Sequence, residues 1–388
     1  MTPTTIPTDQ VVDFELSPEL TAFRDEVRAF VAETRLTERA ASFDAEVAFP
    51  RDVIEAAAAR GLLGVTIPKK YGGRQLGNLA SCVMLEELNA ACASTGVTVS
   101  VHNSLVSSPL AKWGNDEQRQ RYLPKLATGE WIGAYCLSEA FSGSDAAALR
   151  CEAKPDGDSF VLNGAKLWIT TGSEADLFIV FARTSADRVK GISAFLVEAG
   201  YPGVGVGKKE RKLGIRGSPT TEIVLADVRV PAANLLGEDG KGFNIALDTL
   251  DGGRLGIASQ SLGIARACRD LLVADLAARK DAKGRPTAPQ SAQWSLADMA
   301  AELDAYRFLT WRAALLRDRG VRCSVEAAMA KLTTSQLCNR AARTLVSILG
   351  PTGATGAAER LLRDARITEI YEGATDIQRL VIARGLLE

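Results

Sequence analysis

A glutamate near the C-terminus, Glu372, has both the side chain and the local setting that proton abstraction needs. Apolar residues recur at helical spacing over Ala357–Tyr371, and Gly373 follows as a helix stop signal. Because Thr375 or Asp376 can cap a second helix, Glu372 is predicted to lie where two helices meet. A carboxylate buried at the negative end of a helix dipole has a raised pKa, as a general base near neutral pH requires. A surface glutamate beside a capping glycine is the alternative interpretation.

Four other stretches carry residues that suit ligand binding, each with a plainer alternative. Leu137–Asp145 is dense in hydroxyls and backbone donors, as a loop around a polar ligand or an ordinary turn would be. Trp168–Thr170 places a flat ring beside a hydroxyl, either on a ligand surface or in a core. Asp251–Arg254 contains two helix glycines that cost roughly 1–2 kcal/mol, which indicates that another helix or a ligand approaches the backbone. Gly203–Lys208 lacks the third glycine of a dinucleotide motif and is predicted to be a loop entering a strand.

The elements that must position these residues fall into three segments, which we predict to be domains: 1–130, 131–240 and 241–388. The first segment is helical. Ser17 and Pro18 begin a helix in which apolar residues recur at helical spacing. Further helices are predicted at 50–61, 79–92 and 115–126.

The middle segment changes to strands. Asn163-Gly164 lies between two apolar runs, 159–162 and 166–170, and predicts a tight hairpin. Further strands are predicted at 177–182, 192–198 and 221–225. Because no long helical pattern separates these runs, an antiparallel barrel or sandwich is favoured over a doubly wound sheet.

The last segment returns to longer helices, predicted at 243–278, 295–319 and 324–349 and on both sides of Glu372. Their apolar stripes and short connections favour an antiparallel bundle. The predicted fold class is therefore α+β, with a helical domain, a β domain and a helical bundle in chain order.

The composition is that of an ordinary globular protein, with 46% apolar and 24% charged residues. A net charge of −1 gives no basis for binding nucleic acid or an anionic membrane, and no apolar run reaches the roughly 18 residues that span a bilayer. The polar stretch Met1–Asp13 is predicted to be a loose tail and not a signal peptide. Seven scattered cysteines without a C-x-x-C pair predict a reducing cytosol and no disulfides. His102 is the only histidine and is predicted to be structural, so no metal site is expected.

Taken together, these segments resemble the acyl-CoA dehydrogenase family, and its short-chain or butyryl-type branch most closely, from about Ser17 to Leu387. The stretches that carry the resemblance are Tyr135–Asp145, Trp168–Thr170, Lys212–Ser218, Asp251–Ala258, Leu296–Met299 and Arg363–Arg379. The resemblance implies an N-terminal helical domain, a middle β domain, a C-terminal four-helix bundle and a homotetramer. It also implies FAD, which this family binds without a Rossmann glycine motif.

By this resemblance, Glu372 is the base that removes the α-proton of an acyl thioester. The β-hydrogen leaves as hydride to flavin N5, which gives a trans-2-enoyl thioester. The thioester oxygen is expected to accept hydrogen bonds from the Glu372 backbone N–H and a ribityl hydroxyl of FAD. In the isovaleryl-type branch the base comes from the region of residues 251–254, where this chain has Gly253. The residues expected to contact the substrate are Ser144, Asp251, Arg254 and Gly373.

The resemblance also implies which residues hold FAD. Those expected along the isoalloxazine ring are Tyr135, Cys136, Leu137, Ser138, Gly143, Ser144, Trp168, Ile169 and Thr170. Those expected at the distal parts of the cofactor, some of them from a neighbouring subunit, are Arg279, Gln290, Ser347, Gly350, Ala374 and Asp376.

The chain departs from the family in this distal group. Counting back from Gln290 without a gap places Arg279 and Ala282 where the family has Arg and Phe. A register with a loop one residue shorter places Lys280 and Lys283 there instead. We prefer Arg279, because lysine lacks the bidentate guanidinium fork. In both registers the aromatic ring is lost.

Two further patterns are altered. The Gln-x-x-Gly-Gly pattern of the family is Ser347–Pro351 in this chain, and Ala140-Phe141 stands where Pro-Gly is common. Ala374 and Asp376 also replace residues that often touch FAD. FAD is therefore expected to be held more weakly than is typical for the family.

The resemblance implies an FAD-dependent dehydrogenase of short or medium acyl-CoA that passes electrons to an electron-transfer flavoprotein, and the cysteine pattern predicts that it is cytoplasmic. One alternative is a dehydrogenase acting on a carrier-protein-bound acyl thioester in a specialised biosynthetic pathway. Another is a non-catalytic or partner-dependent subunit with a decayed FAD site. Oxidases that react directly with oxygen form a further group, and nitroalkane oxidases usually carry Asp as base, which Glu372 disfavours. The uncharged stretch 94–101 lacks the Arg that glutaryl-type relatives use.

Overall fold

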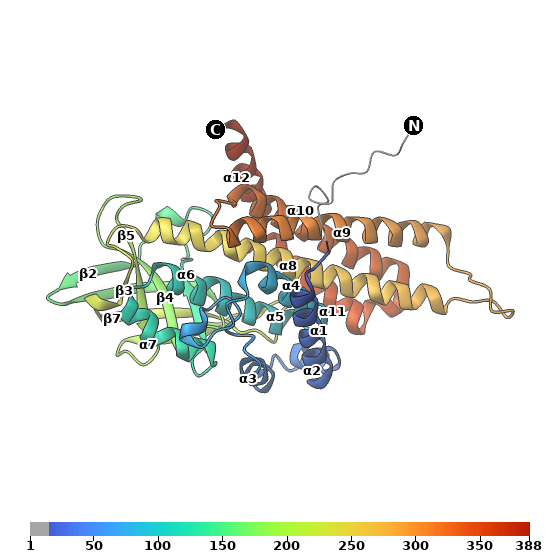
Figure 1. Cartoon of the computed structure of the whole chain (residues 1–388), viewed down its shortest axis with the longest axis horizontal. Helices are drawn as coiled ribbons and strands as arrows, with labels where there is room; N and C mark the ends of the chain where they lie inside the picture. The colour runs from blue at the N-terminus through green and yellow to red at the C-terminus, as the bar shows by residue number, and fades with distance from the viewer. Residues whose placement is uncertain (1–14) are drawn as a thin grey trace.

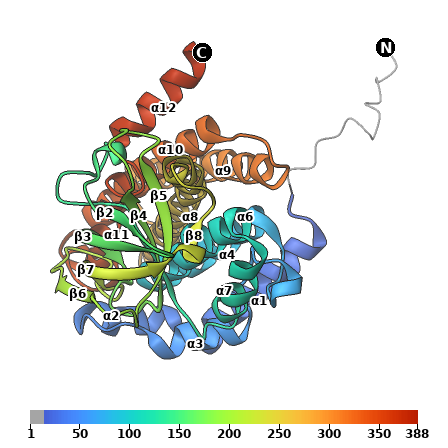
Figure 2. The same ribbon diagram turned by 90° about the vertical axis from the view of Figure 1, so that its left-hand side faces the viewer.

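The computed structural model describes residues 15–388, so the predicted tail Met1–Asp13 lies outside the described residues. Figure 1 shows a β-sheet at one end of the molecule, long helices that run away from it, and the N-terminal helices packed along both. Seen from the sheet end in Figure 2, the sheet lies in front of the long helices, with the N-terminal helices in blue below and beside it.

The predicted helical character of the N-terminal segment is confirmed. Its helices are α1 (Pro18–Glu33), α2 (Leu36–Ala45), α3 (Arg51–Ala59), the 3₁₀ turn η2 (Lys69–Tyr71), α4 (Gly77–Ala91), α5 (Ala93–Ser100), the π-helical stretch η3 (Val101–Ser107), α6 (Ser108–Trp113) and α7 (Asp116–Ala127). Ser17 Oγ accepts the Leu20 N–H at 3.3 Å, as a cap of α1 should. At the start of α4, Asp318 from a helix far along the chain accepts the Asn78 N–H at 2.6 Å. With this remote cap, the observed helix begins two residues before the predicted helix 79–92 and ends one residue before it does.

The middle segment forms an eight-stranded sheet in the order β6-β7-β3-β2-β4-β5-β8, with β1 paired to β4. The strands are β1 (Gly133–Cys136), β2 (Glu152–Asp156), β3 (Ser159–Thr170), β4 (Leu177–Arg183), β5 (Ile192–Glu198), β6 (Val204–Lys209), β7 (Thr220–Pro231) and β8 (Leu235–Leu236). Most pairings are antiparallel, but β1 and β2 both run parallel to β4. The sheet is therefore mixed, in a fold class that is otherwise as predicted.

The predicted hairpin at Asn163-Gly164 is wrong. Both residues lie inside β3, and the turn falls between β2 and β3, near Gly157 at φ 62°. Asn163 and Gly164 mark a shift of register against β7, where Asn163 Nδ2 donates to Asp227 at 2.9 Å. A Cβ on Gly164 would lie 2.9 Å from the Cα of Cys151, so the glycine is needed for close approach of the backbones. The Asn-Gly pair therefore lies at a β-bulge inside β3 and not in a hairpin turn.

The predicted long C-terminal helices are confirmed. They are α8 (Gly242–Ala278), α9 (Gln290–Asp318) and α10 (Ser324–Leu349), followed by the 3₁₀ turn η6 (Gly350–Ala354), α11 (Gly356–Ala365), the 3₁₀ turn η7 (Arg366–Glu369) and α12 (Thr375–Leu387). The single helix predicted over 357–371 is thus divided into α11 and η7. Figure 1 shows α12 projecting from the body, with the C-terminus at its tip.

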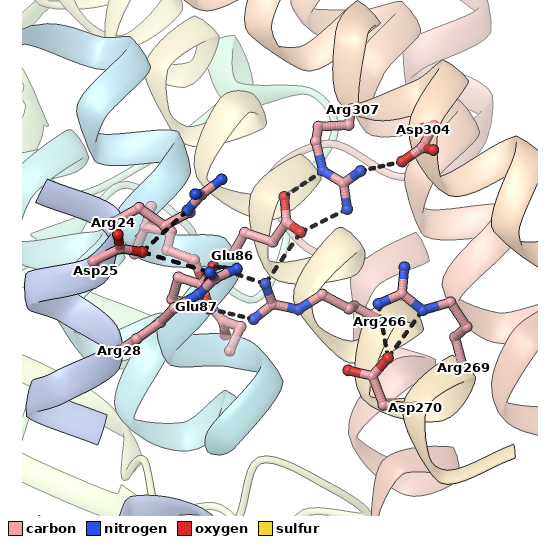
Figure 3. A network of polar contacts seen from close by, with 12 residues as sticks. Arg24, Asp25, Arg28, Glu86, Glu87, Arg266, Arg269, Asp270, Asp304 and Arg307 are labelled. Carbon is pink, nitrogen blue, oxygen red and sulfur yellow. Dashed lines mark hydrogen bonds and ion pairs between the residues drawn. The ribbon is translucent and has the colours of Figure 1, made fainter. Parts of the chain in front are cut away.

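Two adjacent buried carboxylates on α4 join the N-terminal helices to the bundle (Figure 3). Glu87 pairs with Arg28 of α1 at 3.0 Å and with Arg266 of α8 at 2.6 Å. Glu86 pairs with Arg307 of α9 at 2.8 Å. Burial alone would raise the pKa of Glu86, but the hydrogen bond and charge of Arg307, with the charge of Arg266, hold it below its usual value. This cluster fixes α4 against α8, the helix that supplies one wall of the candidate site.

His102 is structural, as predicted. It is fully buried, its Nδ1 accepts the Gly133 N–H at 3.2 Å, and its Nε2 therefore donates to the Leu126 carbonyl at 3.0 Å. Burial lowers the pKa of His102 to about 4, so the ring stays neutral. All seven cysteines are free and buried. Among residues 15–388, no helix is both long and apolar enough to cross a bilayer.

Candidate active site

Glu372 lies in the elbow between η7 and α12, as predicted. Its φ of 53° is left-handed, a strained conformation for a residue other than glycine, and Gly373 follows at φ 89°. The predicted side-chain cap of α12 is wrong, because Ala374 occupies the N-cap position. The Thr375 hydroxyl is used elsewhere: it donates to the Glu369 carbonyl at 3.2 Å and ties the start of α12 back to η7.

The carboxylate of Glu372 is enclosed even though the residue as a whole keeps some exposed surface. Its Oε2 is buried and has no hydrogen-bond partner among residues 15–388. Burial raises the pKa of Glu372 to about 7, against the opposing charges of Arg254 and Lys331. The raised pKa expected for this residue is confirmed, with burial as its main cause. The group can therefore accept a proton near neutral pH.

Gly253 of α8 faces this carboxylate and explains one of the two helix glycines. A Cβ at Gly253 would lie 2.5 Å from Glu372 Oε2 and 2.9 Å from Cδ2 of Leu105. A Cβ at the neighbouring Gly252 would meet only the guanidinium of Arg317, at 3.3 Å. The bare backbone of Gly253 is thus the surface against which the Glu372 carboxylate rests.

Asp251 and Arg254, predicted to contact substrate, form a buried ion pair one helical turn apart on α8. Asp251 accepts from Arg254 Nη1 at 2.6 Å and from the Ser324 hydroxyl at 2.6 Å. Arg254 Nε is buried without a partner among the described residues. Asp251 is thereby satisfied within the protein, while Arg254 keeps one free donor near Glu372.

Two buried side chains that the sequence analysis missed hold the elbow. Lys331 Nζ and Gln378 Nε2 each donate to the Gly373 carbonyl at 2.7 Å, and Gln378 Nε2 also reaches the Glu372 carbonyl at 3.3 Å. Both side chains are fully buried. A lone lysine inside the apolar run Ala327–Leu332 is the signal that could have identified Lys331.

Two tyrosines flank the carboxylate. Tyr135 of β1 packs edge-on against Phe181 with ring centroids 5.1 Å apart, and its hydroxyl is buried without a partner within residues 15–388. Tyr371 donates its hydroxyl to Gln260 of α8. Burial raises the pKa of both tyrosines well above the usual value, with a further contribution from the charge of Glu372. Both are therefore neutral hydrogen-bonding groups at physiological pH.

The β1 segment alternates between two cores. Tyr135 and Leu137 pack in the core that the sheet shares with the helices, whereas Cys136 packs inside the sheet domain. Cys136 therefore has only backbone groups to offer a ligand. Ser138 is half-buried, and its carbonyl accepts the Leu167 N–H at 2.9 Å.

The loop after β1 is open at its tip and anchored at its base. Gly143 and Ser144 are exposed, and a Cβ on Gly143 would meet nothing within 4 Å. Its base is held by Glu139, which the sequence analysis missed. Glu139 accepts from the Arg150 N–H at 2.6 Å and from the buried Lys166 ammonium at 2.6 Å. The loop is thus fixed to β3 while its polar tip is free to contact a ligand.

The end of β3 presents the flat surface expected there. Trp168 is 57% exposed, whereas Ile169 is packed inside the sheet domain and Thr170 is half-buried. Trp168 and Thr171 both have left-handed backbone, at φ 57° and 63°. Thr171 donates its N–H to the Pro219 carbonyl at 2.7 Å, which holds this irregular strand end in place. Ile169, like Cys136, can reach a ligand only through its backbone.

Three family models match the chain in order. They are described as the acyl-CoA dehydrogenase N-terminal domain over residues 17–130, the middle domain over 134–228 and the C-terminal domain over 240–387. This chain belongs to the acyl-CoA dehydrogenase family.

Individual acyl-CoA dehydrogenases agree with this assignment and with the short-chain branch. The mitochondrial short-chain specific acyl-CoA dehydrogenase of Mus musculus is 48% identical over 360 residues, which cover 92% of this chain and 87% of that protein. The structure of butyryl-CoA dehydrogenase from Megasphaera elsdenii matches with a TM-score of 0.93 and 37% identity, over 97% of this chain and 100% of that chain. The structure of an FAD complex of PigA matches with a TM-score of 0.92 and 27% identity, over 97% and 99%.

Four of the six predicted distal residues of this acyl-CoA dehydrogenase lie apart from Glu372. Arg279 pairs with Asp275 at 2.8 Å and donates to the Ile348 carbonyl at 3.1 Å, next to Ser347. The loop between α8 and α9 lies at the end of the bundle away from the sheet (Figure 1). Within one chain, this end is separated from the elbow by most of the length of α10.

The other predicted distal residues form two groups, one at the end of the bundle away from the sheet and one at the base of α12. Gln290 is exposed at the start of α9, and Gly350 turns the chain after α10 with φ 62°. Ala374 and Asp376 instead line a surface pocket of about 380 Å³ at the base of α12. Asp376 points its carboxylate to Arg379, which donates to it at 2.8 Å.

Proposed function

We propose that this acyl-CoA dehydrogenase oxidises the Cα–Cβ bond of a short or medium acyl-CoA to a trans-2-enoyl-CoA, with FAD as cofactor and Glu372 as the α-proton base. The observation that carries the proposal is the enclosed, unpartnered carboxylate of Glu372 over the bare backbone of Gly253. Relatives named for short-chain acyl-CoA and butyryl-CoA support the substrate class.

Proton abstraction is the step that the chain itself performs. Glu372 Oε2 makes no hydrogen bond within the described residues, so its lone pairs are available to a Cα proton. The Cα–H bond is very weakly acidic, and the thioester oxygen must be held as enolate character develops. The backbone N–H of Glu372 contacts no acceptor in residues 15–388 and can donate to that oxygen. Arg254 and Lys331 favour the ionised base against its burial.

The residues predicted to hold the cofactor have the chemistry that the flat, partly polar ring of FAD needs. Trp168 is an exposed aromatic face, and the Tyr135 hydroxyl is buried without a partner in the described part of the chain. The residues proposed to hold the ring are Tyr135, Cys136, Leu137, Ser138, Gly143, Ser144, Trp168, Ile169 and Thr170, with Cys136 and Ile169 acting through their backbone. When bound, FAD supplies the hydride acceptor for the β-hydrogen. The shared fold with an FAD complex supports the assignment.

The remaining proposals concern assembly and context. Because Arg279, Gln290, Ser347 and Gly350 lie away from Glu372, we propose a homotetramer in which a neighbouring subunit supplies them to the cofactor.

Seven free thiols fit a reducing cytoplasm. An electron-transfer flavoprotein is the proposed acceptor. The three matched segments support domain boundaries near residues 130 and 240.

The test of this function is anaerobic mixing of the purified holoenzyme with acyl-CoAs of increasing chain length, followed by absorbance at the flavin bands. We expect rapid bleaching with butyryl-CoA or a neighbour of similar length. Bleaching by the same acyl group only on a carrier protein would replace the CoA substrate with the carrier thioester. A protein that purifies without flavin and binds none would refute the enzymatic proposal.

We expect FAD to leave this protein faster than it leaves the Megasphaera elsdenii enzyme. Ala282 offers no ring to stack on the cofactor, and Ser347 and Pro351 replace an amide side chain and a glycine of the family pattern. The measurement is the flavin absorbance retained by both proteins through the same extended dialysis. Ala282→Phe should slow the loss. Full retention by the unaltered chain would contradict the prediction.

A further inference from the structure

Lys331 is a buried cation beside the elbow. In the proton abstraction proposed above, it only adds to the positive charge that keeps Glu372 ionised. Its side chain has 0% exposed surface, and its ammonium donates to the Gly373 carbonyl at 2.7 Å. Among residues 15–388, no carboxylate lies close enough to form an ion pair with it. A buried ammonium that has one neutral hydrogen-bond acceptor, and no ion-pair partner among the described residues, destabilises the folded state. A functional role for Lys331 would explain why the residue is there.

We propose that Lys331 is a positioning residue for proton abstraction: it fixes the Gly373–Ala374 peptide beside Glu372 and, as a cation, favours the ionised carboxylate. The inference rests on the proposed function, because only a base that must be both ionised and immobile gains from such a partner. It adds to that function a residue that sets the working pH range of the enzyme.

The geometric half of this role is shared with Gln378. Glu372 and Gly373 are two successive left-handed residues, a conformation that needs support from its surroundings. The Gly373 carbonyl receives both Lys331 Nζ and Gln378 Nε2 at 2.7 Å. Gln378 is neutral and as buried as Lys331. Both residues donate to the same carbonyl but only Lys331 is charged, so variants of the two residues separate the effect of the hydrogen bond from the effect of the charge.

The electrostatic half of this role is shared with Arg254. The charged groups that face Glu372 are Arg254 from α8 and Lys331 from α10. Arg254 acts in the same direction and has the larger effect on the pKa of Glu372, although it is also paired with Asp251 at 2.6 Å. Tyr135 from β1 and Tyr371 from the elbow itself remain neutral, since burial raises their pKa values.

The coupling between the lysine and the base is reciprocal. Burial lowers the pKa of Lys331 to about 8, while the charge of Glu372 and then that of Glu369 act to raise it, and Arg254 opposes them. Lys331 is therefore still largely protonated where Glu372 titrates. Its charge stabilises the ionised form of Glu372, so loss of that charge must raise the pKa of the base.

The test compares three variants of the FAD-loaded protein: Lys331→Gln, which keeps a donor but loses the charge, Lys331→Met, which loses both, and Gln378→Met, which loses only the neutral donor. Each is mixed anaerobically with butyryl-CoA from acid to alkaline pH, and the rate of flavin bleaching is fitted to a midpoint. Both Lys331 variants should raise the midpoint by roughly one unit, which makes the reaction about tenfold slower on the acid side. Gln378→Met should lower the plateau rate and leave the midpoint in place.

An unchanged midpoint in Lys331→Gln would overturn the proposal and leave Lys331 a structural residue. Lys331→Arg, which retains the charge, should keep the midpoint of the unaltered protein, and a shift in it would count equally against the proposal. If Lys331→Met does not fold, Lys331→Gln still decides the question. Glu372→Gln serves as the reference: bleaching by that variant would refute the proposed function itself, whatever Lys331 does.

Discussion

Glu372→Gln should abolish flavin reduction by butyryl-CoA while the protein keeps its fold and its FAD. Glutamine has nearly the same shape and can occupy the same enclosed space, but its amide cannot accept the Cα proton. Because the base acts directly on the bond that breaks, we expect the rate of bleaching to fall by about 10³- to 10⁴-fold. Single-turnover absorbance measures this step without depending on the electron acceptor.

The control for this variant is Glu326→Gln, which removes a carboxylate of α10 that pairs with Arg312 at 3.3 Å near the surface. Its bleaching rate should match that of the unaltered protein. The unaltered protein should also lose rate as the pH falls below the pKa of Glu372, about 7, because the protonated carboxyl cannot accept a second proton. Persistent bleaching by Glu372→Gln at any pH would show that another group is the base.

Gly253→Ala should inactivate the enzyme at little cost in stability. The added Cβ would lie 2.5 Å from Glu372 Oε2 and 2.9 Å from Leu105 Cδ2, closer than such atoms approach one another. Both atoms are the ends of flexible side chains, so the fold can yield by moving them. Moving the Glu372 carboxylate, however, displaces the base, and a misplacement of about 1 Å can reduce the rate roughly 100-fold.

Gly252→Ala is the matched control for this prediction. It makes the same change one residue earlier, where the new Cβ meets only the movable guanidinium of Arg317 at 3.3 Å. Each alanine should contribute about 1 kcal/mol of helix propensity. We expect the Gly252 variant to retain its bleaching rate and gain thermal stability. Equal rates in the two variants would show that Gly253 does not seat the base.

The position of Glu372 could be predicted because its signals are local: a helical pattern before it, a glycine after it and a second helix beyond. The glycine pair at 252–253 likewise indicated a close approach, without showing that the approaching group is the base itself. Lys331 and Gln378 were missed, because a lone lysine in an apolar run does not reveal its distant partner, and no local pattern shows that Gln378 folds back onto the elbow. Asp318, which caps the start of α4, is a similar case, because it is 240 positions along the chain from its donor Asn78.

The Asn163-Gly164 error has a different origin. The pair supplies the backbone freedom that a turn uses, but a bulge in a long strand uses the same freedom. What separates the two outcomes is the partner strand: β7 continues alongside β3 past the pair, and Asp227 binds the Asn163 side chain. Local residue preferences contain no information about that partner.

The carboxylates Glu86 and Glu87 restrict how this region can change over evolutionary time. Each pairs with arginines from other helices, so a mutation of either glutamate, or of Arg266 between them, leaves every remaining charge with at least one partner. Only a second loss would leave a buried charge without a partner, at a cost of about 3–5 kcal/mol. A first substitution in the cluster is therefore expected to be tolerated, and it fixes the members that remain, because each residue that paired with the lost one has then lost its alternative partner.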